Sequence, residues 1–269
     1  MSSNSAFASA VPSTLPRVAI VTGASRGIGR AIALGLAQNG CDILLTARDR
    51  ERLDAVASEI RLLGRRAEFV VADLRERGAA AEIVAAALAG FDRIDILVNN
   101  AGATKRGDFE SLTDDDWADG FALKLHGAVR LTRAAWPHLR AAHGAVVNIA
   151  GVGGRTPGSE FTIGGSVNAA VLAFTKALAD VGVRDEVQVN ALNPGYIRTD
   201  RFAARLQKLA AARGVTLAEA ERRIVAEEQM TRIGEPADVA AAVSFIVSPA
   251  ARYLHGASID LDGGQTKTL

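Results

Sequence analysis

Short runs of β-branched and aliphatic residues alternate with helix-length segments along most of the chain. The runs lie at 17–22, 41–47, 66–72, 94–99, 144–150, 186–192 and 257–263. Helical patterns follow the first two runs, at 27–39 and 50–62. Continuous apolar strands that alternate with helices predict a doubly wound α/β fold, with a parallel sheet of about seven strands and helices on both faces.

The chain of 269 residues is predicted to fold as one domain over 17–269, because its 49% hydrophobic and 23% charged residues are typical of globular proteins that bury a large core. Residues 1–16 lack the basic start and apolar centre of a signal peptide, and we interpret them as a disordered leader. A helix-rich insertion at about 199–230 follows the sixth run. Ligands in such folds bind beyond the carboxyl ends of strands, so the insertion is a candidate lid or, alternatively, a solvated helical excursion.

The charge balance argues against a polyanionic partner. Lys plus Arg number 31 against 30 Asp plus Glu, a net charge of +1, so neither nucleic acid nor an anionic membrane is a predicted partner. No unbroken apolar run approaches the ~18 residues that span a bilayer. The single cysteine, Cys41, excludes an intrachain disulfide and a cysteine-based metal cluster, and no metal site is predicted. Its apolar surroundings predict a buried structural thiol, and a lone thiol fits a cytoplasmic location.

The segment 22–29, TGASRGIG, is a glycine-rich turn between the first predicted strand and the first predicted helix. Gly23 permits a tight turn, Gly27 lets backbone amides approach a pyrophosphate, and Gly29 lets the helix pack closely on the sheet. A glycine-rich turn alone is a weak signal. Because this one lies within a strand-helix-strand unit, it predicts a dinucleotide site.

Two arginines predict a preference for the phosphorylated cofactor. Arg48 ends the second strand, where an NAD-selective site has a carboxylate for the ribose diol. Arg26, in the glycine-rich turn, is expected to lie close to the same end of the second strand. Two guanidinium groups can bind a 2′-phosphate by bidentate, charge-assisted hydrogen bonds, so NADP(H) is predicted over NAD(H). Alternatively, either arginine is a solvated turn residue.

Five motifs, in their order and spacing, resemble the short-chain dehydrogenase/reductase family, and in particular its 3-oxoacyl-carrier-protein reductase-like members, over 17–264. They are TGASRGIG at 22–29, AD at 72–73, NNAG at 99–102, NPGYIRT at 193–199 and LDGG at 261–264. The resemblance implies a Rossmann fold, a nicotinamide cofactor, a small-molecule carbonyl or alcohol substrate, and a homotetramer or homodimer. It implies cofactor contacts from Gly23, Ser25, Arg26, Gly27, Ile28, Gly29, Arg48, Asp73, Leu74, Asn100, Ala101, Gly102, Asn168, Pro194, Gly195, Ile197 and Thr199.

The catalytic Asn, Ser, Tyr and Lys of that family are missing here. In the family, the tyrosine transfers a proton and the lysine four residues later lowers its pKa. The only tyrosines of this chain, Tyr196 and Tyr253, are followed four residues later by Asp200 and Ala257. The family's proton-transfer motif is therefore absent.

Alignment on the helix that contains NAAVLAFTKALA identifies what has replaced the family's four residues. Lys124 stands at the Asn position, Gly151 at the Ser, Gly164 at the Tyr and Asn168 at the Lys. A cation and an amide have thus exchanged places, and the two glycines are expected to enlarge the pocket. We expect Asn168 to hydrogen-bond the nicotinamide ribose and Lys124 to reach the reacting centre from the opposite helix.

Three functions are compatible with this altered site. In the first, hydride transfer persists and Lys124, with a pKa depressed by partial desolvation, stabilises the oxyanion or donates the proton. Alternatively, its ammonium caps the bulge in its own helix or pairs with an acid. The second function is silent NADP(H) binding, and the third is a non-redox reaction. The intact NNAG and NPGYIRT motifs favour the first.

Other polar residues near the site are weaker candidates. Near the missing tyrosine they are Ser159, Glu160, Thr162 and Ser166. Helix-entry hydroxyls are usually caps, and Tyr196 is expected to pack as a pocket wall. The basic lid residues Arg201, Arg205, Lys208 and Arg213 hint at a carboxylate or acyl-carrier thioester substrate, although a solvated helix face explains them equally well.

Overall fold

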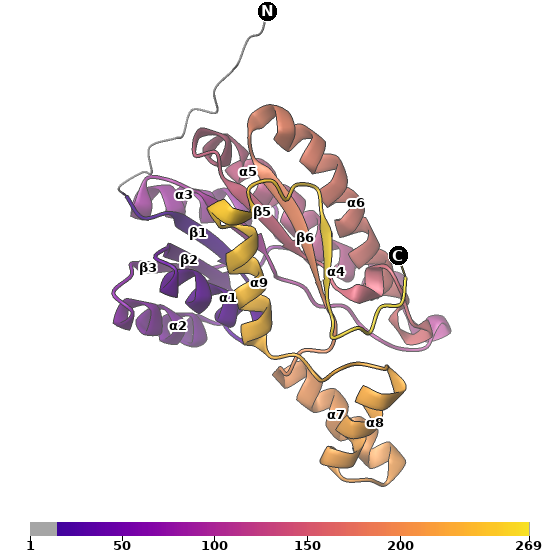
Figure 1. Cartoon of the computed structure of the whole chain (residues 1–269). Coiled ribbons are helices and arrows are strands. Elements are labelled where there is room, and N and C mark those ends of the chain that lie inside the picture. The colour runs from indigo at the N-terminus through magenta and orange to yellow at the C-terminus, as the bar shows by residue number, and fades with distance from the viewer. Residues whose placement is uncertain (1–14, 269) are drawn as a thin grey trace, which may run out of the picture.

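A computed structural model describes residues 15–268 and centres on one seven-stranded sheet of parallel strands, in the order β3-β2-β1-β4-β5-β6-β7 (Figure 1). The strands are β1 Val18–Thr22, β2 Asp42–Ala47, β3 Ala67–Val71, β4 Ile96–Asn99, β5 Ala145–Ile149, β6 Gln188–Pro194 and β7 Ser258–Leu261. The helices are α1 Gly27–Gln38, α2 Arg50–Leu62, α3 Ala79–Phe91, α4 Asp114–Phe121, α5 Gly127–Ala141, α6 Thr162–Asp185, α7 Asp200–Arg213, α8 Leu217–Glu227 and α9 Pro236–Ile246. The predicted Rossmann-like, doubly wound fold is confirmed. Of the predicted leader, residues 1–14 lie outside the described residues.

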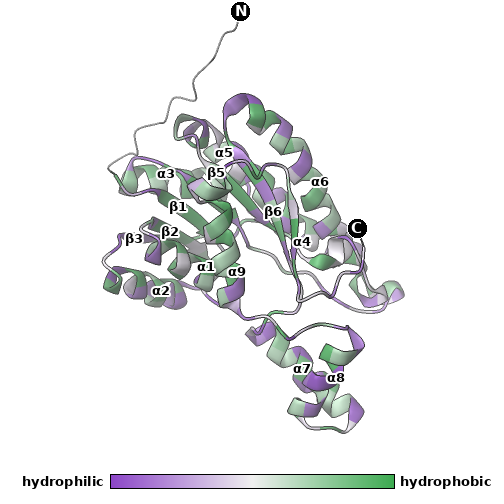
Figure 2. Cartoon of the chain, in the orientation of Figure 1, coloured by the Kyte–Doolittle hydropathy of each residue, from purple (hydrophilic) through white to green (hydrophobic). Residues whose placement is uncertain are grey.

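Alternate residues of each strand enter two separate cores, one on each face of the sheet. In β1, Ala19 and Val21 face the core covered by α1, α2 and α9, whereas Val18 and Ile20 face the core covered by α3, α5 and α6. Figure 2 shows these central strands as predominantly hydrophobic. Burial on both faces explains why the strands read as continuous apolar runs. Cys41 lies in the first of these cores, where burial raises the pKa of its thiol, as expected of a structural cysteine.

Helix α6 and the short turn before it, over 159–185, are long and apolar enough to cross a membrane by length and composition. A core helix meets the same criterion: α6 packs against β6 in the sheet, and several of its residues, such as Val167 and Val171, are buried. The absence of a membrane partner stays a prediction.

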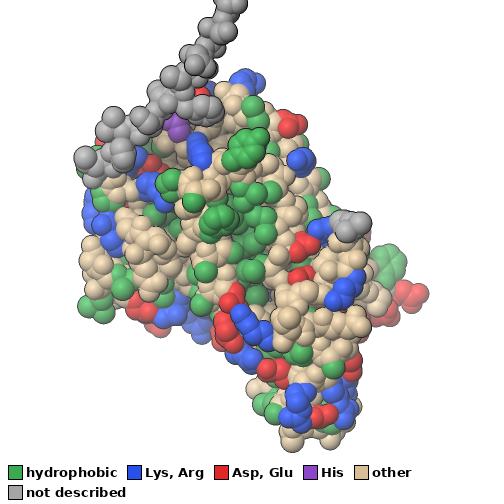
Figure 3. All heavy atoms as spheres, viewed as in Figure 1, with side chains coloured by type: hydrophobic (Ala, Val, Ile, Leu, Met, Phe, Trp, Pro, Cys, Tyr) green, Lys and Arg blue, Asp and Glu red, His purple; other side chains and the backbone are tan. Residues whose placement is uncertain are grey.

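Helices α7 and α8 form the predicted helical insertion after β6, and they project from one end of the sheet (Figure 1). They enclose a small apolar cluster that includes Phe202, Leu206, Ala220 and Ile224. An ion pair of 2.7 Å between Arg213 and Glu227 joins the two helices. Acidic and basic side chains are interspersed over this lobe (Figure 3). The insertion is therefore a packed lobe with its own core, and its role as a lid stays a prediction.

Candidate active site

The strand order reverses between β1 and β4, and in sheets of this kind ligands bind beyond the carboxyl ends of the strands at such a reversal. The glycine-rich turn follows β1 and the NNAG motif ends β4, so both lie there. Asn100 joins the two: its Nδ2 donates to the Thr22 carbonyl at 2.8 Å. The backbone N–H groups of Asn100 and Ala101 both donate to Thr22 Oγ1 at 2.9 Å. The Asn100 side chain thus braces the turn.

The turn before α1 has the backbone that pyrophosphate binding requires. Gly23 and Gly27 have φ of +64° and +55°, a left-handed conformation that glycine tolerates best. A Cβ on Gly29 would overlap the Gly23 carbonyl, so the close approach of helix and turn requires glycine. The N-cap residue, Arg26, makes no capping hydrogen bond, and within the described chain no backbone acceptor engages the N–H groups of residues 27–29. These open donors at a helix N-terminus fit the phosphates of a dinucleotide.

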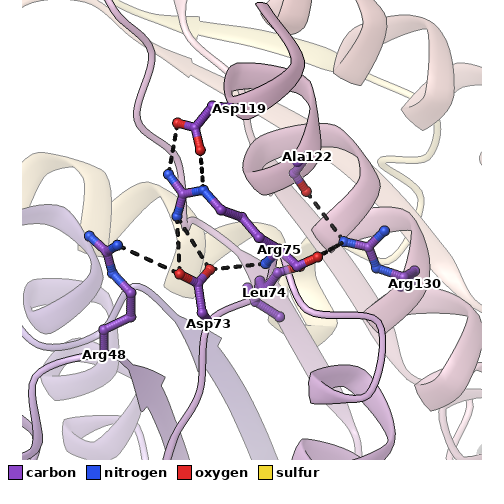
Figure 4. Close-up of polar contacts among 7 residues, drawn as sticks. All are labelled: Arg48, Asp73, Leu74, Arg75, Asp119, Ala122 and Arg130. Atoms are coloured by element: carbon purple, nitrogen blue, oxygen red, sulfur yellow. Dashed lines mark hydrogen bonds and ion pairs between the residues drawn. The ribbon is translucent and has the colours of Figure 1, made fainter. Parts of the chain in front are cut away.

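Arg48 and Asp73 lie beyond the ends of β2 and β3 and face each other (Figure 4). Arg48 Nη1 is 3.6 Å from Asp73 Oδ2. Asp73 also accepts from the backbone N–H of Arg75 at 3.0 Å and from its Nη1 at 3.3 Å. Burial raises the pKa of Asp73, but the hydrogen bonds from Arg75 outweigh it and the net pKa is lowered. Arg75 also binds Asp119 through two hydrogen bonds, so Asp73 is held by a fixed network (Figure 4).

Arg26 does not share this network. Its Nη1 lies 3.4 Å from Asp200 Oδ2, at the start of α7, and both side chains are exposed. The sequence predicts Arg26 near Arg48, and the structure pairs the two guanidinium groups with different carboxylates. The reason is tertiary: α7 brings an acid to the turn from 174 residues further along the chain.

The other predicted cofactor residues lie at the same edge of the sheet, beyond the carboxyl ends of its strands. Thr199 accepts from Phe202 N as the N-cap of α7, and its Cγ2 is 3.4 Å from where a Cβ on Gly27 would stand. The carbonyl of Leu74 accepts from Arg130 at 2.8 Å (Figure 4). The remaining positions are Ser25 and Ile28 at the turn, Gly102 after β4, and Pro194, Gly195 and Ile197 at the end of β6.

Three of the four altered positions converge on one short segment after β5. Lys124 lies in a π-helical turn, Ala122–His126, between α4 and α5. Its Nζ donates to the Ala150 carbonyl at 2.6 Å. The next residue, Gly151, has a φ of +141°, and a Cβ there would lie 3.1 Å from Asn168 Nδ2. Lys124 and Asn168, from different helices, therefore both contact the segment 150–151.

The ammonium of Lys124 has no acidic partner within the described residues. Burial lowers the pKa of Lys124, and the nearby charge of Arg201 lowers it further, to about 7. Arg201 Nη2 donates to the Gly102 carbonyl at 3.0 Å. The stem of Lys124 packs on the same glycine, where a Cβ would lie 2.9 Å from Lys124 Cδ. The alternatives of an acid pair or a cap on its own helix are therefore wrong for Lys124, which bonds to Ala150 instead.

Asn168 is 4% exposed, and its Oδ1 has no hydrogen-bond partner within the described structure. A buried polar atom without a partner costs about 1–3 kcal/mol. A hydroxyl donor, such as that of a ribose, would satisfy this oxygen.

Gly164, at the tyrosine position, does not enlarge the pocket, so that prediction is wrong. The ring of Phe161 fills the space, and a Cβ on Gly164 would overlap its atoms. A Cβ on Gly153 would also lie 2.7 Å from this ring. The guanidinium of Arg106 stacks on the ring, 3.9 Å from its centroid. Sequence reasoning missed Phe161 and Arg106; the available signal was an aromatic residue one helical turn before a glycine.

Tyr196 packs against the apolar cluster of α7 and α8, and its role as a pocket wall stays a prediction. Its hydroxyl donates to Glu228 Oε1 at 3.1 Å, and its ring meets Phe202 edge-on with centroids 5.9 Å apart. Burial raises its pKa, so the hydroxyl stays protonated at neutral pH.

The predicted capping role of Thr162 and Ser166 is wrong. Phe161 is the N-cap residue of α6, and it makes no side-chain capping bond. Thr162 Oγ1 is buried without a partner in the described chain. Both residues line a cleft together with Ser159, Trp117 and Phe109.

Comparisons with known proteins agree with this architecture. The family model described as short chain dehydrogenase matches residues 17–210. An uncharacterized oxidoreductase of Mycobacterium tuberculosis is 38% identical over 254 residues, which cover 93% of this chain and 92% of the relative. L-Sorbose reductase from Gluconobacter frateurii, solved with NADPH and L-sorbose, has a TM-score of 0.91 and 32% identity, covering 94% of this chain and 98% of that one.

A further solved relative is a short chain oxidoreductase of Pseudomonas aeruginosa PAO1, bound to NADPH and described as containing an atypical catalytic center. Its TM-score is 0.87 at 28% identity, covering 94% of this chain and 98% of that one. Family model, sequence relative and solved structures each match most of the chain, and the relatives are oxidoreductases. The chain therefore belongs to the short chain dehydrogenase family and is an oxidoreductase of that family.

Proposed function

We propose that this protein is an NADPH-dependent carbonyl reductase in which Lys124 replaces the family's tyrosine as the proton donor. The observation that carries the proposal is the environment of Lys124, whose pKa is lowered to about 7 while its Nζ is held at the Ala150 carbonyl. Proton transfer is most efficient when the donor's pKa lies near the working pH. An ordinary lysine, with a pKa of about 10.4, is too weak an acid for this task.

The residues beyond the carboxyl ends of the strands fit a nicotinamide dinucleotide. The open N–H groups of residues 27–29 would bind its pyrophosphate, and the unpaired Oδ1 of Asn168 would accept from a ribose hydroxyl. Arg48 would bind a 2′-phosphate in exchange for its 3.6 Å contact with Asp73. The NADPH bound in the relatives from Gluconobacter frateurii and Pseudomonas aeruginosa supports NADP(H).

When bound, the cofactor supplies a hydride to the carbonyl carbon. Lys124 hydrogen-bonds the carbonyl oxygen and transfers one proton from Nζ to it, which leaves a neutral amine and an alcohol. The Ala150 carbonyl orients Nζ, and the positive charge of Arg201 favours the loss of the proton. Phe161 closes the side of the site where a tyrosine hydroxyl would otherwise stand and excludes water there.

Single-turnover oxidation of NADPH across a panel of carbonyl compounds tests this proposal. Lys124→Met is expected to lower the rate by about 10²- to 10⁴-fold, because it removes the proton donor. The dissociation constant for NADPH, measured by fluorescence, should change less than threefold, or about 0.7 kcal/mol. An unchanged rate in Lys124→Met would remove Lys124 as the donor. Tight NADPH binding without turnover in the wild type would favour silent cofactor binding instead.

The assembly follows from the family resemblance and the cytoplasmic location from the single cysteine, and both remain predictions. A homotetramer or homodimer would be recognised by light scattering of the purified protein. The cytoplasmic location would be tested by cell fractionation.

A further inference from the structure

Three arginines from two separate segments gather around the altered site. Arg106, in the loop after β4, stacks on Phe161 at 3.9 Å from the ring centroid. Arg205, in α7, lies over the ring of Tyr196 at 4.8 Å. Arg201, one turn earlier in α7, reaches the Gly102 carbonyl, on which Lys124 also packs. The cluster formed by Arg106, Arg201 and Arg205 thus borders the proposed proton donor.

None of these three guanidinium groups forms an ion pair with a carboxylate within residues 15–268. Other arginines of the same lobe do: Arg213 binds Glu227 at 2.7 Å, and Arg198 binds Glu221 at 2.8 Å. The cluster therefore differs from the interspersed, mutually neutralising charges on the rest of the lobe. A solvated helix face, the alternative explanation from the sequence, does not account for Arg106, which comes from another part of the chain.

The cluster members are close enough to repel one another. Partial burial lowers the pKa of Arg106, and the charges of Arg205 and Arg201 lower it further, with only partial compensation from Tyr196 and Glu160. Partial burial and the charge of Arg26 lower the pKa of Arg201 in the same way. Like charges held together without counter-ions cost free energy, which a bound anion would lower.

The stacking geometry leaves hydrogen-bond donors available. A guanidinium that contacts an aromatic ring through its flat face keeps its N–H groups pointing outward in the plane. Those donors form the fork that matches the oxygens of a carboxylate or phosphate. Arg106 and Arg205 each lie over an aromatic ring, and neither guanidinium makes a hydrogen bond within the described chain.

Within the cluster, Arg201 bonds the carbonyl of Gly102, a predicted cofactor residue, whereas Arg106 and Arg205 lie over the rings of Phe161 and Tyr196. Arg106 stacks on the ring that fills the tyrosine position, which by the family alignment is the substrate side of the site. We infer that the substrate is a small carbonyl compound with an anionic oxygen group, a carboxylate or a phosphate, bound by Arg106 and Arg205. This inference rests on the proposed function, because it names the substrate class of the same site.

Matched pairs of carbonyl compounds test the inference. Wild-type kcat/KM is measured with α-keto and β-keto acids beside their methyl esters, and with dihydroxyacetone phosphate beside dihydroxyacetone. At least one anionic compound should exceed its neutral partner by about 10- to 100-fold, since a hydrogen bond to a charged group contributes about 1.5–3 kcal/mol. The keto acid and phosphate arms identify which oxyanion the cluster prefers. Equal rates for every pair would overturn the inference.

Substitutions of Arg106 and Arg205 test whether these two residues bind the anionic group of the substrate. Arg106→Gln and Arg205→Gln should each lower the ratio of kcat/KM for the preferred anion over that for its neutral partner by about 10-fold or more. Arg222→Gln is the matched control, because it removes one exposed arginine from the same lobe, in α8, without touching the cluster. Equal losses for the anionic and neutral partners would contradict a role in anion binding.

A binding assay separates failure of this inference from failure of the proposed function. If NADPH is present and no turnover occurs, the reductase proposal fails, and calorimetry then measures whether the keto acid or phosphate binds. Binding to the wild type that is lost in Arg106→Gln would still support the anion site. Absence of binding by every anionic compound would overturn the inference. Arginine-dependent turnover of carrier-protein thioesters alone would also overturn it, since the anion would then be on a macromolecule.

Discussion

The ring of Phe161 occupies the space in which a side chain at position 164 would begin, so this position of the ring requires glycine at 164. The missing tyrosine of this family member is thus replaced by an aromatic wall contributed from three residues earlier. The tyrosine hydroxyl is lost, and the Phe161 ring stands where the side chain of residue 164 would begin. In the proposed mechanism the proton therefore comes from another residue, Lys124, whose Nζ donates to the Ala150 carbonyl.

Gly164→Ala should destabilise the protein by about 1–3 kcal/mol, because the added methyl overlaps the Phe161 ring. In a Phe161→Ala background the same change should stabilise by up to about 1 kcal/mol, since alanine is the better helix former. Urea denaturation of the four proteins in this double-mutant cycle measures both values. The same effect in both backgrounds would show that the two residues are not coupled.

The pH dependence of reduction should follow the titration of the Lys124 ammonium. Reduction needs the protonated ammonium, so kcat/KM should be level below the lowered pKa near 7 and fall about tenfold per pH unit above it. Alcohol oxidation needs the neutral amine and should rise over the same range. Arg201→Gln removes a neighbouring positive charge, so the pKa of Lys124 should rise and the fall in reduction should move to higher pH. A profile that Arg201→Gln leaves in place would contradict this coupling.

Lys124 should also make stability depend on pH. Its pKa is lower in the folded state, at about 7, than its ordinary value of 10.5, so the unfolded chain binds the extra proton between these values. Stability therefore rises with pH over this interval. Lys124→Met should therefore raise the free energy of unfolding above that of the wild type, and by about 1–3 kcal/mol more near pH 6.5 than near pH 9.5. This range includes a discount for solvent screening, because the residue is partly accessible. Denaturation at the two pH values measures the difference, and a pH-independent difference would exclude a depressed pKa.

Arg48 should control the choice of cofactor. Arg48→Glu removes the guanidinium that faces Asp73 and adds a carboxylate suited to the ribose diol, so the ratio of kcat/KM for NADPH over NADH should fall by about 10- to 100-fold. Arg52→Gln, which alters an exposed pair with Asp49 in α2, is the control and should leave the ratio unchanged. If Arg48→Glu keeps the wild-type ratio, the 2′-phosphate is recognised elsewhere.

The sequence predicted the parts of this structure that depend on local pattern. Strands such as β1 are buried on both faces, so they are continuous apolar runs that can be recognised without tertiary information. The turn at Gly23 and Gly27 was predictable because its backbone conformation requires glycine. The resemblance supplied the alignment of Lys124 and Asn168, which the structure brings to one segment.

The features that the sequence did not predict involve side chains whose role depends on tertiary packing. Phe161 has no polar group, and only its position in space shows that it fills the tyrosine site. Arg106 lies in a loop without periodicity, so its stacking on that ring has no sequence pattern. Arg26 pairs with Asp200, a partner that tertiary structure alone brings close. These contacts join distant segments and have no local signal.

A crystal structure of the protein with NADPH tests the central claim most directly. We predict that the nicotinamide ribose hydrogen-bonds Asn168 and that Lys124 Nζ faces the open side of the nicotinamide ring, where a carbonyl oxygen would bind. A nicotinamide that lies away from Asn168, with Lys124 turned from the ring and another proton donor in its place, would contradict the account.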